Sequence, residues 1–196
     1  MPRLADGATL PRVSTFAGRL IVAAPLLTDP NFDRTFILLL EHDDDDGALG
    51  VVLNRPTDIP ADEPVPGWGG LASAPGVVFA GGPVQAGAAI ALGRLRPDVE
   101  VREHETARAG VVVVDLGDDP ADAGPRLVEL RLFAGYAGWS PGQLEDELAE
   151  GAWFVVDADP ADPLTSDPSG LWRRVLGRQP GRLGWLRHYP DDVTTN

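Results

Sequence analysis

The stretch GWSPG, residues 138–142, matches the G-x-S-x-G pattern that carries the nucleophilic serine of many hydrolases. In those enzymes the backbone N–H of the residue after the serine helps to hold the oxyanion of the intermediate. Here that residue is Pro141, which has no N–H. His188 and Asp191 follow in the wrong order for the fold that uses this motif. We therefore predict that Ser140 is not a nucleophile, and we assign no catalytic residue.

The same serine suits the start of a helix. Ser140 fits the N-cap position, Pro141 fits the first helical position, and Gln143 completes a capping box. Gly151 can end the helix, because glycine readily adopts the left-handed conformation found there. The sequence thus predicts a short helix over residues 141–150.

The acidic run HDDDDG, residues 42–47, resembles a cation-binding loop. An EF-hand loop needs Asp at position 1, Gly at position 6 and Glu at position 12. Placing Gly47 at position 6 puts His42 at position 1 and Leu53 at position 12, so both end ligands are wrong. We interpret the run as a solvated turn.

Two other patterns also fail as sites. His42, His104 and His188 are far apart and lack the ligand spacing of a zinc motif. The run GGPV, residues 81–84, has none of the spacing of a phosphate-binding loop, and Pro83 removes one N–H from any anion nest. We predict no metal site and no cofactor.

Composition excludes further chemistry. The chain of 196 residues has no cysteine, and all 16 of its basic residues are arginine, which excludes thiolate sites, Schiff-base lysines and a P-loop lysine. The net charge of −14 disfavours direct binding to nucleic-acid phosphates. One segment is positively charged despite the negative net charge. It has no acidic residue and contains Arg173, Arg174, Arg178, Arg182 and Arg187. Without a membrane-length apolar run or a secretory signal, the expected location is the cytoplasm.

Apolar runs separated by turn residues predict the elements that position these side chains. Helices do not alternate regularly with strands, which predicts an α+β fold with a curved, mixed or antiparallel sheet. Residues 1–17 are expected to be loosely ordered, residues 18–180 to form one domain, and residues 181–196 to form a tail. Residues 57–76, rich in Pro and Gly, are expected to be a loop. Strands are predicted at residues 18–25, 35–42, 48–56, 77–84, 87–95, 110–117, 126–138 and 152–158, and short helices at 141–150 and 169–178.

Six polar or aromatic residues near strand ends form the candidate ligand or partner cluster: Glu41, His42, Asn54, Arg55, Tyr136 and Trp139. The apolar runs at residues 35–42 and 48–56 predict a hairpin, in which the polar members can lie together or at opposite rims. Each member also has a structural alternative, because Asn54 and Arg55 could tie down strand ends. Tyr136 and Trp139 could pack over glycines.

Three blocks of this sequence resemble the YqgE/AlgH family of bacterial proteins: residues 18–56, the GGPV run and residues 135–154. The resemblance implies an α+β domain with a coiled, partly split β-sheet in the bacterial cytoplasm. The family has no agreed enzymatic activity, so the resemblance implies none. Members carry the label of transcriptional regulator, but this sequence contains no DNA-binding motif that would support it.

Three functional hypotheses follow. The first is a non-enzymatic binding or regulatory domain that uses the six-residue cluster to engage a protein or small-molecule partner. The second is a hydrolase-type enzyme with Glu41 and His42 as acid–base groups. The third is weak DNA binding through the C-terminal arginines. The sequence defines neither the partner nor the oligomeric state.

Overall fold

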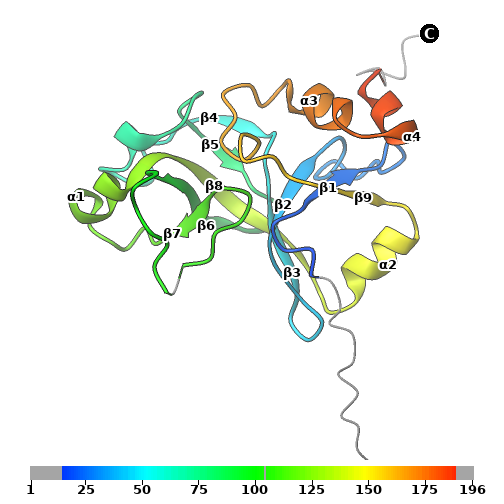
Figure 1. Ribbon diagram of the computed structural model, residues 1–196, viewed down its shortest axis with the longest axis horizontal. Helices are drawn as coiled ribbons and strands as arrows, with labels where there is room; N and C mark the ends of the chain where they lie inside the picture. Colours follow the sequence, from blue (N-terminus) through cyan, green and yellow to red (C-terminus); the bar gives the residue numbers. More distant parts are fainter. Residues whose placement is uncertain (1–14, 104, 189–196) are drawn as a thin grey trace, which may run out of the picture.

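The computed structural model describes residues 15–103 and 105–188 (Figure 1). Predictions for residues 1–14, His104 and residues 189–196 lie outside this part of the chain. Within it, no helix is long and apolar enough to cross a membrane. The strands are β1 (Leu20–Ala23), β2 (Phe36–Asp43), β3 (Gly47–Val52), β4 (Pro56–Pro60), β5 (Val77–Ala80), β6 (Val84–Leu95), β7 (Val112–Val114), β8 (Leu127–Trp139) and β9 (Trp153–Val156). The α-helices are α1 (Pro120–Ala123), α2 (Gln143–Ala149), α3 (Leu171–Gly177) and α4 (Gly181–Trp185), and single 3₁₀ turns span Gly69–Leu71, Gly124–Arg126 and Leu186–His188.

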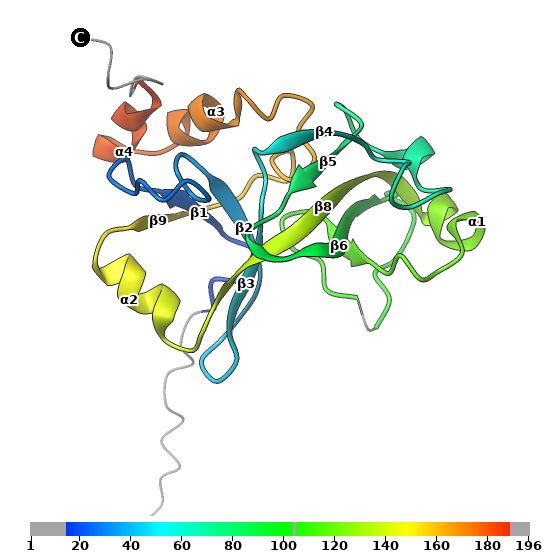
Figure 2. The same ribbon diagram turned by 180° about the vertical axis from the view of Figure 1, so that it is seen from behind.

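The long strand β8 joins two halves of one curled sheet. Its first part pairs with β6 and, in parallel, with β5, whereas its last three residues pair with β3. The sheet then continues from β3 through β2 and β1 to β9, all antiparallel. Figures 1 and 2 show the two halves on either side of the β2–β3 hairpin. The predicted α+β class with a curved, partly split sheet is confirmed.

The two halves meet where two chain segments cross without side chains between them. A Cβ atom on Gly135 would lie 2.5 Å from the carbonyl oxygen of Gly82, and one on Gly82 would lie 2.2 Å from the carbonyl carbon of Tyr136. Gly135 also has a φ of +69°, which glycine adopts at little cost. The GGPV and GYAGW runs are therefore the two sides of one backbone crossing.

Separate hydrophobic clusters line the two sides of the β2–β3 hairpin. On the concave side of the sheet, Leu38, Val51 and Phe133 pack with residues of α3. On the opposite side, Leu39, Val52 and others pack against α2 and β9. We call these the concave face and the α2 face. A third cluster lies between β6, β8 and the segment before β5.

The predicted capping box of α2 forms only in part. The backbone N–H of Ser140 donates to Oε1 of Gln143 at 3.1 Å, which is the bond that the glutamine of a capping box accepts. The helix itself starts two residues later than expected, at Gln143; its N-cap is Gly142 with a φ of +78°, and no side chain caps it. A tight turn, closed by the Gln143 N–H and the Ser140 carbonyl, precedes the helix. The end of the helix is as predicted: Gly151 has a φ of +78° and lies in a Schellman pattern of hydrogen bonds.

Other sequence predictions vary in accuracy. The hairpin of β2 and β3 is confirmed, with the acidic run as its turn. The segment 57–76 is not all loop, because β4 pairs with β5. The helix α4 occupies Gly181–Trp185, where a tail was expected.

Candidate binding site

A β-bulge in β2 decides where two candidate residues point. The pairing shifts between Leu39 and Glu41, so that two residues of β2 stand opposite Leu49. A bulge re-aims the side chains that follow it. Leu40 and Glu41 consequently lie on the concave side, while His42 joins Leu39 on the α2 face.

His42 is enclosed on the α2 face. Its side chain is 3 % exposed, and its Nε2 lies 2.6 Å from Oε1 of Glu145 in α2. The backbone N–H of Phe16 donates to its Nδ1 at 3.2 Å. The Nδ1 therefore carries no proton, and Nε2 donates to Glu145. Every polar atom of this ring already has a partner.

Trp139 lies on the same face, and its indole N–H also has a hydrogen-bond partner. Its indole N–H donates to Oε2 of Glu147 at 2.9 Å, and the indole of Trp153 donates to the same oxygen at 2.7 Å. Phe32 packs against both indoles. Glu147 thus holds two buried tryptophans between α2 and the sheet.

Asn54 and Arg55 lie at the other end of the hairpin. The Asn54 amide accepts from the Phe36 backbone N–H at 3.0 Å and donates to the Arg34 carbonyl at 2.9 Å. Arg55 donates to the carbonyl of Asp33 at 2.7 Å. Both side chains fasten the chain that enters β2, as the structural alternative anticipated. The six-residue cluster therefore separates. Asn54 and Arg55 lie at the far end of the hairpin and His42 is enclosed against α2, whereas Glu41, Tyr136 and Trp139 line one cleft.

Glu41 lies at the junction of two clefts on the concave face. Cleft 1, of about 600 Å³, runs between β2, β6, β7 and the segment 102–118, and its walls include Leu40, Ile90, Leu92, Arg108 and Val113. Cleft 2, of about 520 Å³, lies over β3 and the end of β8, and its walls include Asp43, Asp46, Leu49, Val84 and Tyr136. Both clefts are lined by Glu41. We call the two together the concave groove.

The carboxylate of Glu41 has no hydrogen bond or ion pair with any residue in 15–103 or 105–188. The residue is exposed, and its neighbours Leu40 and Leu49 are apolar. A ligand that enters either cleft can therefore reach this charge. Pockets that bind ligands typically combine apolar walls with a few such polar groups.

Cleft 1 has a firm charged wall. Glu105 makes two hydrogen bonds with the guanidinium of Arg126, and this contact lowers the pKa of Glu105 to about 2 despite the opposing effect of burial. The same contact raises the pKa of Arg126. The Nη1 of Arg102 lies 3.7 Å from Oδ2 of Asp118, which makes an ion pair. Arg108 is less fully paired, because its buried Nε has no acceptor among the described residues.

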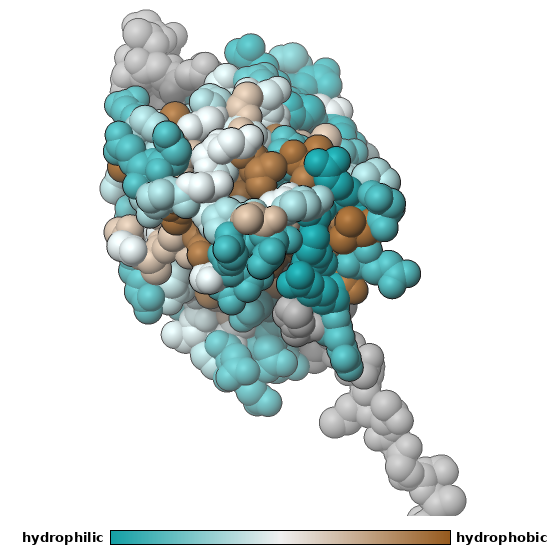
Figure 3. Space-filling model, turned by 90° about the vertical axis from the view of Figure 1, so that its left-hand side faces the viewer, coloured by the Kyte–Doolittle hydropathy of each residue, from teal (hydrophilic) through white to brown (hydrophobic). Residues whose placement is uncertain are grey.

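One side of the groove is an irregular strand edge. Residues 85–88 of β6 have no partner in β8, because the pairing passes directly from Val84 to Ala89. On its other edge, β6 pairs with β7 only from Ala91 to Gly93. Figure 3 views the molecule from the side that carries β7 and α1, and shows apolar surface ringed by hydrophilic residues. Val113 of β7, which lines cleft 1, is 51 % exposed.

Comparisons with known proteins identify the family. A family model described as AlgH-like (DUF179) matches residues 20–184. The chain belongs to this AlgH-like family. A "UPF0301 protein" of Streptomyces avermitilis is 48 % identical over 188 residues, which cover 94 % of this chain and 97 % of the relative. One of Thermobifida fusca is 42 % identical over 93 % of this chain and 96 % of its own.

Two solved structures share the AlgH-like fold. The crystal structure of protein DIP2367 from Corynebacterium diphtheriae superposes with a TM-score of 0.81 at 32 % identity, covering 90 % of this chain and 93 % of that one. The solution structure of AlgH from Pseudomonas aeruginosa gives a TM-score of 0.65 at 25 % identity, covering 98 % and 100 %. The family has no established biochemical activity.

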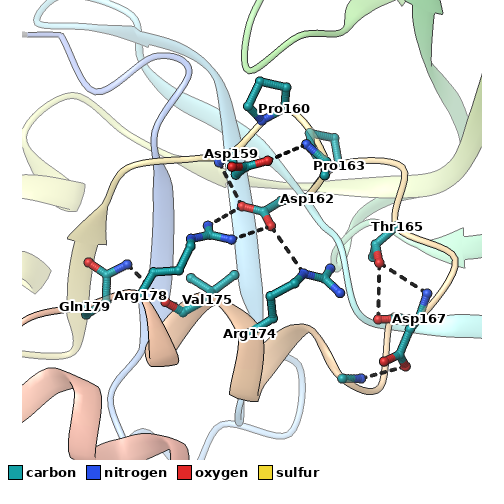
Figure 4. A network of polar contacts seen from close by, with 12 residues as sticks. Asp159, Pro160, Asp162, Pro163, Thr165, Asp167, Arg174, Val175, Arg178 and Gln179 are labelled. Atoms are coloured by element: carbon teal, nitrogen blue, oxygen red, sulfur yellow. Dashed lines mark hydrogen bonds and ion pairs between the residues drawn. The ribbon is translucent and has the colours of Figure 1, made fainter.

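In this AlgH-like chain, two of the five C-terminal arginines serve the fold. Arg178 forms a bidentate pair with the fully buried Asp162, and the Nε of Arg174 lies 3.7 Å from the same carboxylate (Figure 4). The contact raises the pKa of Arg178. Arg173 and Arg182 are exposed, and Arg187 donates to His188. The arginine segment therefore holds α3 against the loop after β9.

No group of three or more potential metal ligands lies close together in the described residues. Asp43 caps the hairpin turn by accepting from the backbone N–H of Asp45. Sequence reasoning predicted the strand at residues 110–117, which contains β7, but assigned no role to Arg102, Glu105 and Arg108, which line cleft 1. The residues before that strand are charged and have no clear period, so no pattern pointed to a site there.

Proposed function

We propose that this AlgH-like protein is a non-enzymatic binding domain that engages a protein or small-molecule partner in the concave groove, in the bacterial cytoplasm. The observation that carries the proposal is the unpaired carboxylate of Glu41 at the junction of two clefts with apolar walls. Elsewhere along the hairpin, neighbouring polar side chains such as His42 and Asn54 are fully engaged.

The acid–base alternative finds little support in the geometry. Glu41 and His42 point to opposite sides of β2, so one substrate cannot contact both. The His42 ring is enclosed and already bonded at both nitrogens. The nucleophile alternative fails for the reason given by the sequence, since Pro141 offers no N–H.

Site-specific thiol labelling tests the proposal. Because the chain has no cysteine, Val113→Cys places one thiol in cleft 1, and Val128→Cys places one at a similarly exposed valine outside both clefts. We expect extract from a bacterium that makes the protein to slow maleimide labelling of Val113→Cys at least threefold relative to buffer. The rate for Val128→Cys should change little, and Glu41→Gln should restore the rate for Val113→Cys. Equal slowing at both positions would sink the proposal.

A further inference from the structure

We infer that the concave groove takes an extended segment of a partner protein, with a basic side chain at Glu41 and its backbone along β6. This inference rests on the proposed function and names the occupant of the same site. Three features of the groove carry it: the sign of its charge, its open strand edge, and the position of its apolar walls.

The charge of cleft 2 favours a cation. Glu41, Asp43 and Asp46 line it, and no basic side chain in the described part of the chain does so. Three carboxylates within one cleft disfavour an anionic ligand and attract a basic one. Arginine or lysine in a partner would give Glu41 the counter-charge that it lacks here.

The edge of β6 favours an extended backbone. Where β7 ends at Val114, opposite Ala91, the edge of β6 continues through Ile90 and Ala89 without a partner strand in the described residues. Residues 85–90 read QAGAAI, which contains no proline or charge of the kind that guards exposed edges. A peptide can therefore continue the line of β7 by hydrogen bonding to this edge, as in β-strand addition.

The apolar walls lie beside that edge. Ile90 packs against the concave cluster, and Leu92 and Val113 stand opposite one another on neighbouring strands. Alternate residues of an added strand face the same side of the sheet about 7 Å apart. A segment in which apolar residues alternate with polar ones, and which carries one basic residue, matches this sequence of apolar and acidic surfaces.

Synthetic peptides test the inference without a known partner. The probe is a seven-residue peptide in which valine, lysine and valine alternate with threonine, measured by fluorescence anisotropy against the full chain. The comparison peptide has glutamate in place of lysine. We expect the lysine peptide to bind at least tenfold more tightly, and Glu41→Gln to remove most of that difference.

Two controls isolate the charge and the edge. Asp44→Asn removes one charge from the same hairpin at a residue that lines neither cleft, so it should preserve the preference for lysine. A lysine peptide with alternate backbone nitrogens methylated keeps its side chains but cannot pair with the edge, and should bind at least tenfold more weakly.

Three results would overturn the inference: no binding of the lysine peptide at millimolar concentration, equal binding of the lysine and glutamate peptides, or indifference to N-methylation. The thiol-labelling experiment separates this failure from failure of the proposed function. If extract still protects Val113→Cys while the peptides do not bind, the groove has a partner of another kind.

Discussion

Polar side chains on the two sides of the β2–β3 hairpin differ in whether they are hydrogen bonded within the protein. On the α2 face, the Nε2 of His42 and the indole N–H groups of Trp139 and Trp153 are bonded to two glutamates of one helix, Glu145 and Glu147. On the concave face, Glu41 is one residue away and has no partner in the described chain. A buried polar group must be paired to be tolerated, whereas an unpaired one is tolerated only where solvent or a ligand reaches it. The contrast separates side chains that hold this fold from those free to bind.

The largest loss of stability should follow from removing the hydrogen-bond acceptor Glu147 on the α2 face. Glu147→Ala leaves the indole N–H groups of Trp139 and Trp153 without their acceptor in a buried setting. We expect the free energy of unfolding to fall by about 3 kcal/mol, measured by urea denaturation, since each buried unsatisfied donor costs about 1–3 kcal/mol.

Two control variants sharpen that test. Glu147→Gln keeps an acceptor oxygen and should lose less than half as much, and Glu150→Ala removes an exposed carboxylate from the end of the same helix at little cost. If Glu147→Ala proved no worse than Glu150→Ala, the α2 face would not be the closed side that the contacts indicate.

A smaller loss of stability should follow from replacing Glu105 in the wall of cleft 1. The pKa of Glu105 is about 2 in the folded protein, below its ordinary value of 4.5, because of Arg126. A carboxyl group whose pKa is lower in the folded than in the unfolded protein stabilises the fold at pH values above its unfolded pKa. This stabilisation is lost as the pH falls from about 4.5 to about 2. We expect Glu105→Gln to cost about 1.5 kcal/mol at pH 7, after allowance for partial solvent screening.

Urea denaturation across that pH range checks the sign. The difference between wild type and Glu105→Gln should shrink as pH falls through the window. The exposed Glu103→Gln should show no such convergence. A difference that stays constant down to pH 2 would contradict the role assigned to the Glu105–Arg126 pair.

The sequence predicted the strands well but not how the six cluster residues are arranged around them, for one physical reason. Apolar runs such as the one in β2 identify a buried strand, but a run apolar at every position does not reveal which side each residue faces. The bulge before Glu41 therefore could not be foreseen, and with it the separation of Glu41 from His42. Likewise, the partners of Asn54 and Arg55 lie about twenty residues away and depend on how β2 and β3 pair.

The turn at the rim of cleft 1 should respond weakly and in the stabilising direction. Ala109 has a φ of +46° in a two-residue turn between Arg108 and Val111, whose backbones exchange two hydrogen bonds. Asparagine tolerates this left-handed conformation better than alanine. We expect Ala109→Asn to raise the free energy of unfolding by about 0.5 kcal/mol. Ala107→Asn, without a positive φ, is the control and should give no gain.

The smallest change in stability should come from the residue on which the proposed function depends. Glu41→Gln removes no hydrogen bond or ion pair within the described chain, and it relieves repulsion from Asp43 and Asp46 across cleft 2. The free energy of unfolding should therefore stay within about 0.5 kcal/mol of wild type, or rise slightly, as is usual for exposed positions. The same variant should abolish most of the preference for the lysine peptide. Because binding residues free of structural duties can change without unfolding the protein, this combination defines the open side of the hairpin. A loss of more than about 2 kcal/mol would instead place Glu41 with Glu147 among the residues that hold the fold.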